Sequence, residues 1–274
     1  MGSWKQGYFL KFLVMLFKGA NLPMSLTYKT STDLIRVGSK YDGGYLVSQS
    51  DIDTSDILIG LGINDDWRFE EHFKSLHDVE VFAYDGSVGN SYFFRKMVKA
   101  ALRFYSPGRF LSALKTLIRY TQFFGRAGVS HIEKYVGFDS AGIPPWEERY
   151  VTLQSIFDSF PSENMFLKID VEGAEYQFLD TLIKNQERLT GLVIEFHDCD
   201  LQLERIEKFK EAIHLKLVHI HANNNATIHK QTSLPTVLEF TFSRNSQNQE
   251  EPTFPHALDM PNRSNRPEIM LSFE

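Results

Sequence analysis

The chain has 274 residues, a length that suits one large α/β domain with additions. Its net charge of −6 and pI near 5.9 argue against a protein that holds nucleic acid by bulk electrostatics. Cys199 is the only cysteine, which excludes an intramolecular disulfide framework and favours a reducing compartment such as the cytoplasm.

An apolar segment near the N-terminus covers residues 8–17 and is interrupted by Lys11. It is too short to span a bilayer, and no A-x-A-like cleavage site follows it. We therefore predict that residues 1–33 form a helical segment that packs on the domain. An interfacial membrane helix is the alternative.

Two turn-and-strand patterns then predict a cofactor site. Residues 41–47 read as a glycine turn entering a strand. The apolar strand 57–59 runs into a glycine loop and a helix, and the strand 79–84 ends at Asp85, which could accept hydrogen bonds from a ribose diol. The predicted cofactor-binding residues are Asp42, Gly43, Gly60, Gly62, Asn64, Asp85 and Gly86.

Acidic residues indicate which cofactor this loop would accept. Asp65 and Asp66 lie where the helix should begin, and a helix N-terminus normally favours an anion. Two carboxylates there would repel a pyrophosphate but tolerate the ammonium and sulfonium of S-adenosylmethionine. The charge pattern therefore favours S-adenosylmethionine over NAD.

A basic segment follows. Residues 95–126 contain eight Lys and Arg but no Asp or Glu, interleaved with aromatic and aliphatic residues and broken at Ser106-Pro107-Gly108. This pattern predicts an amphipathic helical hairpin over the active site. The hairpin could be a lid with a solvated basic face, could grip an anionic acceptor, or could rest on an anionic membrane that presents a lipid-linked glycan.

Three later strands end in polar residues. The apolar runs 165–169, 192–194 and 216–218 precede acids, histidines and amides. Open α/β sheets build their active sites at the carboxyl ends of such strands. A further strand is expected at 130–136, and one at 237–242 should close the sheet's edge. The residues at the strand ends are Asp170, Glu172, Glu195, His197, His219, His221 and Asn223.

Several of these motifs together resemble the FkbM-type methyltransferases. The resemblance lies in Tyr41-Asp42-Gly43-Gly44-Tyr45, Gly60-Leu61-Gly62, Ile194-Glu195-Phe196-His197 and, most specifically, the run from Leu167 to Glu175. It extends from about Leu34 to Ser243. It implies a Rossmann-like, seven-stranded class I methyltransferase sheet and S-adenosylmethionine-dependent O-methylation of hydroxyls on sugars, polysaccharides or polyketides. The resulting organisation is an N-terminal segment 1–33, a methyltransferase domain 34–244 with the insertion 95–128, and a C-terminal arm 245–274 with a short last strand.

The chemistry expected of the site is methyl transfer to an acceptor oxygen. A sugar hydroxyl has a pKa far above neutrality, so it needs a base or a cation to activate it. Asp170, Glu195 and His197 could hold Mg²⁺ or Mn²⁺, or His197 could take the proton while an acid orients its ring. The predicted catalytic residues are Asp170, Glu195, His197 and His221, with Asn223 as a further acceptor contact.

We therefore interpret the chain as an S-adenosylmethionine-dependent O-methyltransferase that acts on a glycan or another hydroxylated acceptor. An NAD(P)-dependent oxidoreductase on the same kind of sheet is one alternative, and Asp65 and Asp66 weaken it. A non-catalytic glycan-binding protein that retains the fold is the other. Nucleic acid is not an expected partner, and peripheral membrane contact follows from one interpretation of the basic hairpin.

Overall fold

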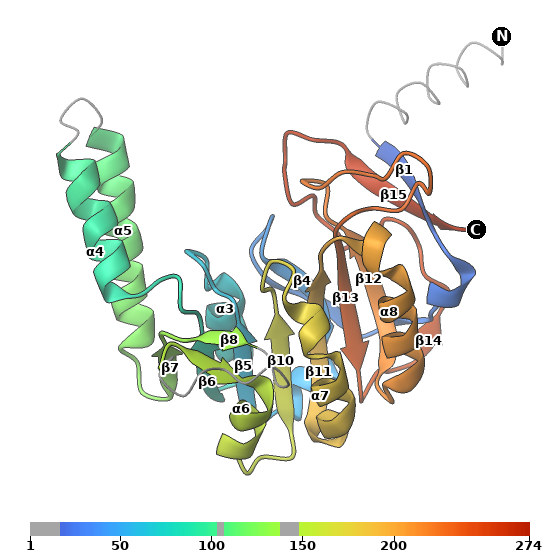
Figure 1. Cartoon of the computed structure of the whole chain (residues 1–274), viewed down its shortest axis with the longest axis horizontal. Coiled ribbons are helices and arrows are strands. Elements are labelled where there is room, and N and C mark those ends of the chain that lie inside the picture. Colours follow the sequence, from blue (N-terminus) through green and yellow to red (C-terminus); the bar gives the residue numbers. More distant parts are fainter. Residues whose placement is uncertain (1–16, 103–106, 138–147) are drawn as a thin grey trace, which may run out of the picture.

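A seven-stranded sheet forms the centre of the molecule in the computed structural model, which describes residues 17–102, 107–137 and 148–274 (Figure 1). The strands lie in the order β12-β13-β11-β10-β5-β6-β7. Their bounds are β5 Ile57–Leu61, β6 Glu80–Tyr84, β7 Val129–Ile132, β10 Met165–Ile169, β11 Leu189–Phe196, β12 Lys216–Ala222 and β13 Leu238–Ser243.

Six strands of this sheet share one direction, and β13 runs against them between β11 and β12. This arrangement confirms the predicted Rossmann-like, seven-stranded α/β sheet. The expectation that strand 237–242 closes the edge was wrong, because the edge strand is β12. All residues of β13 are buried, as its position between two strands requires.

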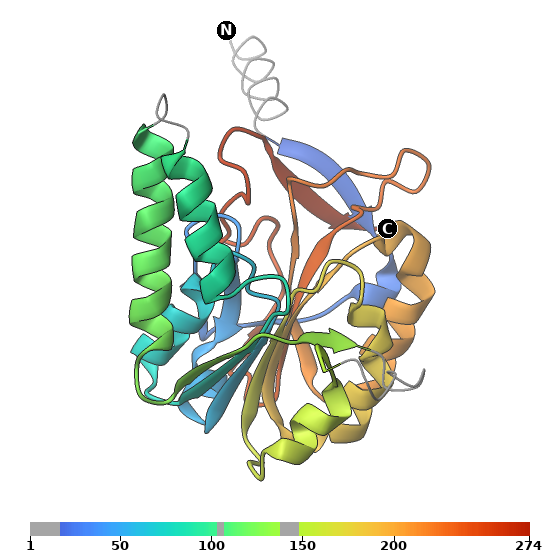
Figure 2. The same cartoon turned by 60° about the vertical axis from the view of Figure 1, so that its left-hand side comes forward.

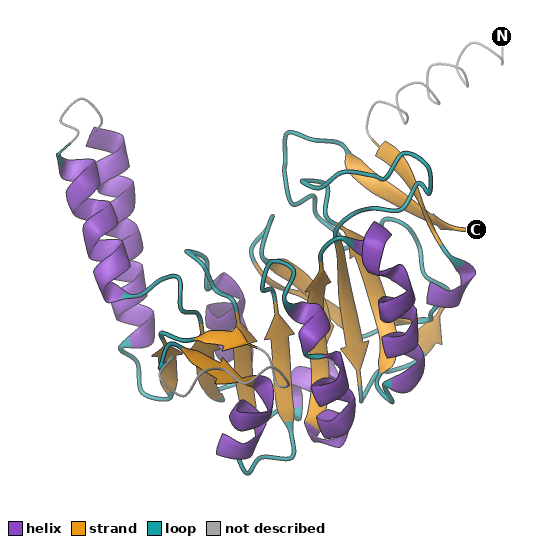
Figure 3. Ribbon diagram, in the orientation of Figure 1, coloured by secondary structure: helices purple, strands orange, loops and turns teal. Residues whose placement is uncertain are grey.

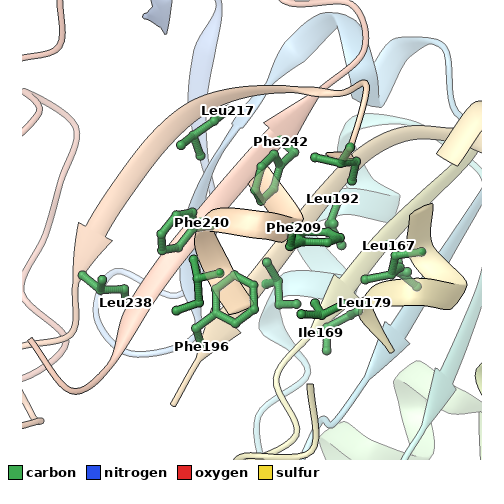
Figure 4. Packing of buried hydrophobic residues seen from close by; sticks show 14 of the residues in the cluster. Leu167, Ile169, Leu179, Leu192, Phe196, Phe209, Leu217, Leu238, Phe240 and Phe242 are labelled. Atoms are coloured by element: carbon green, nitrogen blue, oxygen red, sulfur yellow. The ribbon is translucent and has the colours of Figure 1, made fainter. Parts of the chain in front are cut away.

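Two layers of apolar side chains cover the two faces of the sheet. Leu167 and Ile169 pack on one face with α7 (Leu179–Asn185) and α8 (Cys199–Ala212), as Figure 4 shows. Phe166 points to the other face, where its ring lies 4.9 Å from that of Phe73 in α3 (Arg68–Leu76). This alternation is the period of two expected for a strand buried on both sides.

Smaller paired strands surround the central sheet. The predicted glycine turn is confirmed, since it joins β3 (Leu34–Gly38) to β4 (Gly44–Ser48). The predicted strand 130–136 is two strands, because the chain turns after Ile132 and β8 (Tyr135–Gly137) pairs with β9 (Tyr150–Thr152) instead. Other short elements are β2 Thr30–Ser31, β14 Gln249–Glu250, α2 Gln49–Asp53, α6 Leu153–Ser159 and the 3-10 helices η1 Met24–Leu26, η2 Glu175–Gln177 and η3 Gln186–Arg188.

The N-terminal and C-terminal parts of the chain form one small sheet. β1 (Phe17–Leu22) pairs in parallel with β15 (Glu268–Phe273). The last short strand was predicted, but the helical prediction for residues 1–33 was wrong at β1 and at β2 (Thr30–Ser31), since strand partners so distant in sequence leave no local signal. The rest of the predicted N-terminal helix, residues 1–16, lies outside the described residues.

The predicted basic hairpin is present and consists of α4 (Asn90–Ala101) and α5 (Pro107–Phe124). Its predicted place over the active site was wrong, because neither helix contributes a residue to the cleft described below. It projects from the end of the sheet near β7 (Figures 1 and 2). Aromatic rings anchor its base, because Trp67 lies 5.7 Å from Phe93 and 5.5 Å from Tyr120. Within the described part of the chain, no helix combines the length and the apolar character needed to cross a membrane.

Candidate active site

A cleft of about 830 Å³ opens at the carboxyl ends of β5, β6, β10 and β11, where loops gather (Figure 3). Nearly all of the predicted site residues line it. Gly60 and His221 do not. The residues in the lining are Asp42, Gly43, Gly62, Asn64, Asp85, Gly86, Asp170, Glu195 and His197.

The loop after β5 is held tightly against the end of β10. Gly62 has a φ of +80°, and a Cβ added to it would lie 1.8 Å from the carbonyl oxygen of Asp170. Only glycine permits both this backbone conformation and this approach. The amide of Asp170 in turn donates to the carbonyl of Leu61 at 2.9 Å. The glycine loop and the end of β10 therefore share one wall of the cleft.

Gly60 serves packing and lies outside the cleft, which corrects its predicted role. It belongs to β5, and a Cβ there would lie 2.6 Å from Oε1 of the fully buried Glu70. The missing side chain makes room for this carboxyl group. An interior strand position thus explains the first glycine of the motif, whereas the loop position explains Gly62.

Asp85 fastens the glycine loop to the end of β6. Its Oδ2 accepts hydrogen bonds from the amides of Ile63 at 3.0 Å and Asn64 at 2.7 Å. Its Oδ1 accepts from the amide and the hydroxyl of Ser87. Burial alone would raise the pKa of Asp85, but these hydrogen bonds lower it overall. These four donors use the positions at which the Asp85 carboxylate can accept hydrogen bonds. A ribose hydroxyl would therefore have to share one of these positions or displace the hydroxyl of Ser87.

The start of helix α3 is already occupied by an acid. The helix begins at Arg68, and Asp66 accepts from both the amide and the guanidinium of this residue.

The cleft as a whole is also acidic. Its lining contains three Lys or Arg residues, Arg68, Lys134 and Lys168, against seven acids, Asp42, Asp65, Asp66, Asp85, Asp170, Glu172 and Glu195. This field favours a cationic ligand over a pyrophosphate.

Asp42 reaches the cleft through the β3–β4 turn. Gly43 follows it with a φ of +74°, and a Cβ there would lie 3.3 Å from a carboxylate oxygen of Asp66. Asn262 in the C-terminal arm donates to Asp42 at 3.2 Å. Burial raises the pKa of Asp42 despite this hydrogen bond. The turn and the C-terminal arm, far apart in sequence, therefore meet at the cleft.

Tyr45 joins the ends of β10 and β11. Its hydroxyl lies 3.2 Å from carboxyl oxygens of both Asp170 and Glu195, and Asn223 donates to Glu195 at 3.0 Å. Burial, followed by repulsion from Asp170 and Glu239, raises the pKa of Glu195 well above its ordinary value. A tyrosine has one hydroxyl proton, so a protonated Glu195 can supply the second proton of this three-group contact. Tyr45 lies in the motif 41–45, but its contact with these acids was not predicted.

His197 is oriented by a buried acid that the sequence prediction also missed. Glu175 Oε1 accepts from the backbone amide of His197 at 2.6 Å and lies 3.2 Å from its ring Nδ1. The opposite ring nitrogen, Nε2, lies 3.5 Å from Glu172 and 3.7 Å from Glu195. Burial alone would lower the pKa of His197, but the hydrogen bond and the charge of Glu175 raise it.

The geometry changes the predicted metal set. Donor atoms of Asp170, Glu172 and His197 lie within 4.8 Å of one another. Glu195, predicted as a ligand, instead shares its oxygens with Tyr45 and Asn223, and its raised pKa favours the neutral form. Glu172 therefore replaces Glu195 among the residues that could hold a cation. The backbone of Glu172 has a φ of +53°, and its side chain is exposed. The sequence pattern does not indicate this left-handed backbone conformation.

Lys168 is a buried cation beneath the glycine loop. Its Nζ donates to the carbonyl oxygen of Gly62 at 2.6 Å and lies 3.9 Å from Asp170. Burial alone would lower its pKa, but attraction to Glu70 and Asp170 raises it overall. The sequence pattern that could have indicated this buried cation is a lysine inside an otherwise apolar strand.

The structure places His221 away from the cleft, so its predicted catalytic contact is not formed. Strand β12 continues to Ala222, and the imidazole lies in the core between Glu239 at 2.9 Å and Glu268 at 3.1 Å. Attraction to these acids raises its pKa well above the ordinary value although burial opposes this. Asn223 follows the strand's last residue and does line the cleft.

Comparisons with solved structures find methyltransferases and related proteins at low identity. A precorrin-6y C5,15-methyltransferase from Geobacter metallireducens is 13% identical over 71% of this chain and 84% of its own, with a TM-score of 0.37. A fibrillarin pre-rRNA processing protein from Methanococcus jannaschii is 11% identical over 70% and 68%, with a TM-score of 0.36. No family model and no curated protein matches the chain. At these values the likeness carries no functional assignment.

Proposed function

We propose that the protein is an S-adenosylmethionine-dependent O-methyltransferase that acts on a hydroxyl of a glycan or a related hydroxylated acceptor. The observation that carries the proposal is an acidic cleft at the carboxyl ends of a methyltransferase-type sheet, with β13 antiparallel between β11 and β12. The resemblance of the run from Leu167 to Glu175 to the FkbM-type methyltransferases gives the acceptor class.

The cofactor end of the cleft suits a cationic nucleoside. S-adenosylmethionine, when bound, supplies an electrophilic methyl group on a sulfonium centre. The acids Asp42 and Asp170 line the same cleft as Gly62, so they would favour the cofactor's positive charges. Asp85 keeps the glycine loop in place for the nucleoside. These residues fit such a ligand in charge and in location.

The acceptor end is polar. The amides Gln177, Asn223 and Asn225 line the cleft together with His197. Side chains that both donate and accept hydrogen bonds suit an acceptor with several hydroxyls. His197 offers Nε2 toward the cleft while Glu175 orients the other nitrogen, so His197 can take the acceptor proton and Glu175 can stabilise the resulting imidazolium.

A divalent cation is compatible with the same residues. Asp170, Glu172 and His197 supply two carboxylates and an imidazole, which suit Mg²⁺ or Mn²⁺, and Glu175 would be the outer partner that metal-binding histidines commonly have. Such an ion would lower the pKa of a coordinated hydroxyl. The histidine-base route and the metal route make different predictions for chelation.

The rival oxidoreductase is disfavoured by specific features. The carboxylate of Asp66 accepts a hydrogen bond from the backbone amide of Arg68 at the start of α3. A nicotinamide dinucleotide would place its pyrophosphate at this helix start. The dinucleotide sheet is also mostly parallel, whereas β13 here is antiparallel inside the sheet.

Calorimetry with S-adenosylmethionine, S-adenosylhomocysteine and NAD, each on the same preparation, tests the proposal. We expect binding of the first two and none of NAD. Radioactive methyl transfer to a panel of free, nucleotide-linked and lipid-linked sugars then tests the acceptor class. Binding of NAD alone would favour the oxidoreductase, and binding of none would leave a scaffold or glycan-binding protein.

A further inference from the structure

We propose that the free end of the α4–α5 hairpin docks the protein on an anionic phospholipid bilayer. The surface concerned, here called the tip surface, belongs to the last turn of α4 and the first turns of α5. It consists of Val98, Lys99, Leu102, Arg109, Leu111 and Lys115, all exposed.

The hairpin is anchored at one end only. Phe93, Tyr120 and Phe123 are buried near its base, where Trp67 packs against the first two. The α5 helix has 18 residues and is therefore about 27 Å long, so its first turns stand well beyond this anchor. Both views show the hairpin rising away from the sheet (Figures 1 and 2).

Apolar side chains stay exposed at the tip surface. Leu102 is 66% exposed and Leu111 is 54% exposed, and Val98 lies one turn before Leu102 on the same side of α4. Leu111 and Ile118, seven residues apart, share the outward side of α5 with Lys115. Large aliphatic residues gathered on a projecting element indicate a contact surface.

The charge of the segment selects the partner. Residues 86–132 contain eight Lys and Arg and no Asp or Glu, whereas the whole chain has a net charge of −6. Nearer the base, Lys96 pairs with Asp65 and Arg119 pairs with Glu71. Lys99, Arg109 and Lys115 form no ion pair within the described residues, and Arg95, lower in α4, bonds only to the carbonyl of Ser91 among them. Three of the four described cations of this segment that lack an ion pair therefore lie where the exposed leucines are.

A bilayer with anionic lipids meets both requirements of this surface. Its headgroups attract Lys and Arg, while its acyl region accepts leucine and valine. A nucleic acid or an acidic glycan would satisfy the cations but leave the aliphatic residues in water. The acidic remainder of the chain would be repelled by the same membrane, so the hairpin would approach it first.

This orientation has a consequence for the cleft. The hairpin rises on the side of the sheet to which the carboxyl ends of the strands point, the side that bears the cleft (Figure 1). Together with the proposed function, on which this point rests, docking makes a membrane-borne hydroxyl compound the acceptor class. Vesicle binding and methyl transfer are measured separately, so either can fail without the other.

Sedimentation with vesicles tests the docking itself. We expect the wild type to bind phosphatidylcholine vesicles that contain phosphatidylglycerol at low salt, and not phosphatidylcholine alone. The triple variant Lys99→Glu, Arg109→Glu, Lys115→Glu should bind at least tenfold more weakly, since each cation near such a surface contributes a factor of about five. The control variant Lys184→Glu, Lys216→Glu, Lys230→Glu reverses the same number of exposed cations elsewhere and should bind like the wild type.

A fluorophore reports whether the aliphatic residues enter the bilayer. Cys199 is fully buried, so a label can be directed to Leu102→Cys at the tip surface or to Thr121→Cys near the base. Emission from position 102 should shift to the blue with anionic vesicles, and emission from position 121 should not. Equal binding by both triple variants, no binding of wild type to any vesicle, or binding to RNA or heparin in place of vesicles would overturn the proposal.

Discussion

The buried carboxylate of Glu175 accepts from the backbone amide of His197 and faces Nδ1 of the same residue. This double contact fixes both the position and the rotation of the imidazole, so that Nε2 is the nitrogen presented to Glu172 and Glu195 in the cleft. Because Glu175 begins η2 after β10 and His197 directly follows β11, the pair also ties the end of β10 to the end of β11.

The first prediction concerns the pH dependence of this pair. If His197 is the base, activity requires the neutral imidazole and falls as pH decreases through its pKa, which Glu175 holds above the ordinary value. Glu175→Gln should move this acid limb of kcat/KM to lower pH and reduce kcat at its plateau. His197→Ala should lower kcat by roughly 10²–10⁴-fold. A pH profile of each variant checks this, and an unmoved acid limb in Glu175→Gln would contradict the assignment.

The second prediction concerns Asp85. Asp85→Ala should raise the dissociation constant of S-adenosylmethionine about tenfold or more, because hydrogen bonds to a charged group contribute about 1.5–3 kcal/mol each and the loop amides of Ile63 and Asn64 lose their acceptor. Calorimetry measures the change. Ser87→Ala is the matched control, since it frees one position on Asp85 while keeping the loop contacts. An unchanged constant in Asp85→Ala would remove this residue from the site.

The third prediction separates the metal route from the histidine route. If Asp170, Glu172 and His197 hold a divalent cation, EDTA should abolish methyl transfer but spare cofactor binding, and Mg²⁺ or Mn²⁺ should restore it. Glu172→Gln should then raise the metal concentration needed for half-maximal activity. Full activity in EDTA together with full activity of Glu172→Gln would leave the histidine-base route alone.

The fourth prediction concerns stability and depends on no ligand. Asp51 in α2 is buried, and burial raises its pKa to about 7. Because the folded form binds a proton that the unfolded form has released, stability should decrease as pH rises from about 4 to above 7, by on the order of 4 kcal/mol for this group. Asp51→Asn should flatten that decrease in urea melts, whereas the exposed Asp53→Asn should not. Parallel pH profiles of wild type and Asp51→Asn would contradict this.

Local sequence patterns determined the central strands and the ends at which the cleft lies. Short apolar runs such as 57–59 and 165–169 have the length and composition of buried strands, and a glycine or an acid directly after them marks the exit. Asp85, Asp170 and His197 could therefore be placed at the cleft from the sequence, because each follows its strand within a few residues.

Tertiary structure alone decided which groups meet. Tyr45 contacts Glu195, which lies 150 residues later in the sequence, and β1 pairs with β15 near the other end of the chain. His221 was predicted at the cleft but lies in the core. Strand β12 was predicted to end at Val218, whereas it continues to Ala222, so His221 belongs to the strand and not to the loop after it. The physical reason is the same in each case: chain direction and periodicity are local properties, whereas the partner of a buried polar group depends on the packing of the whole sheet.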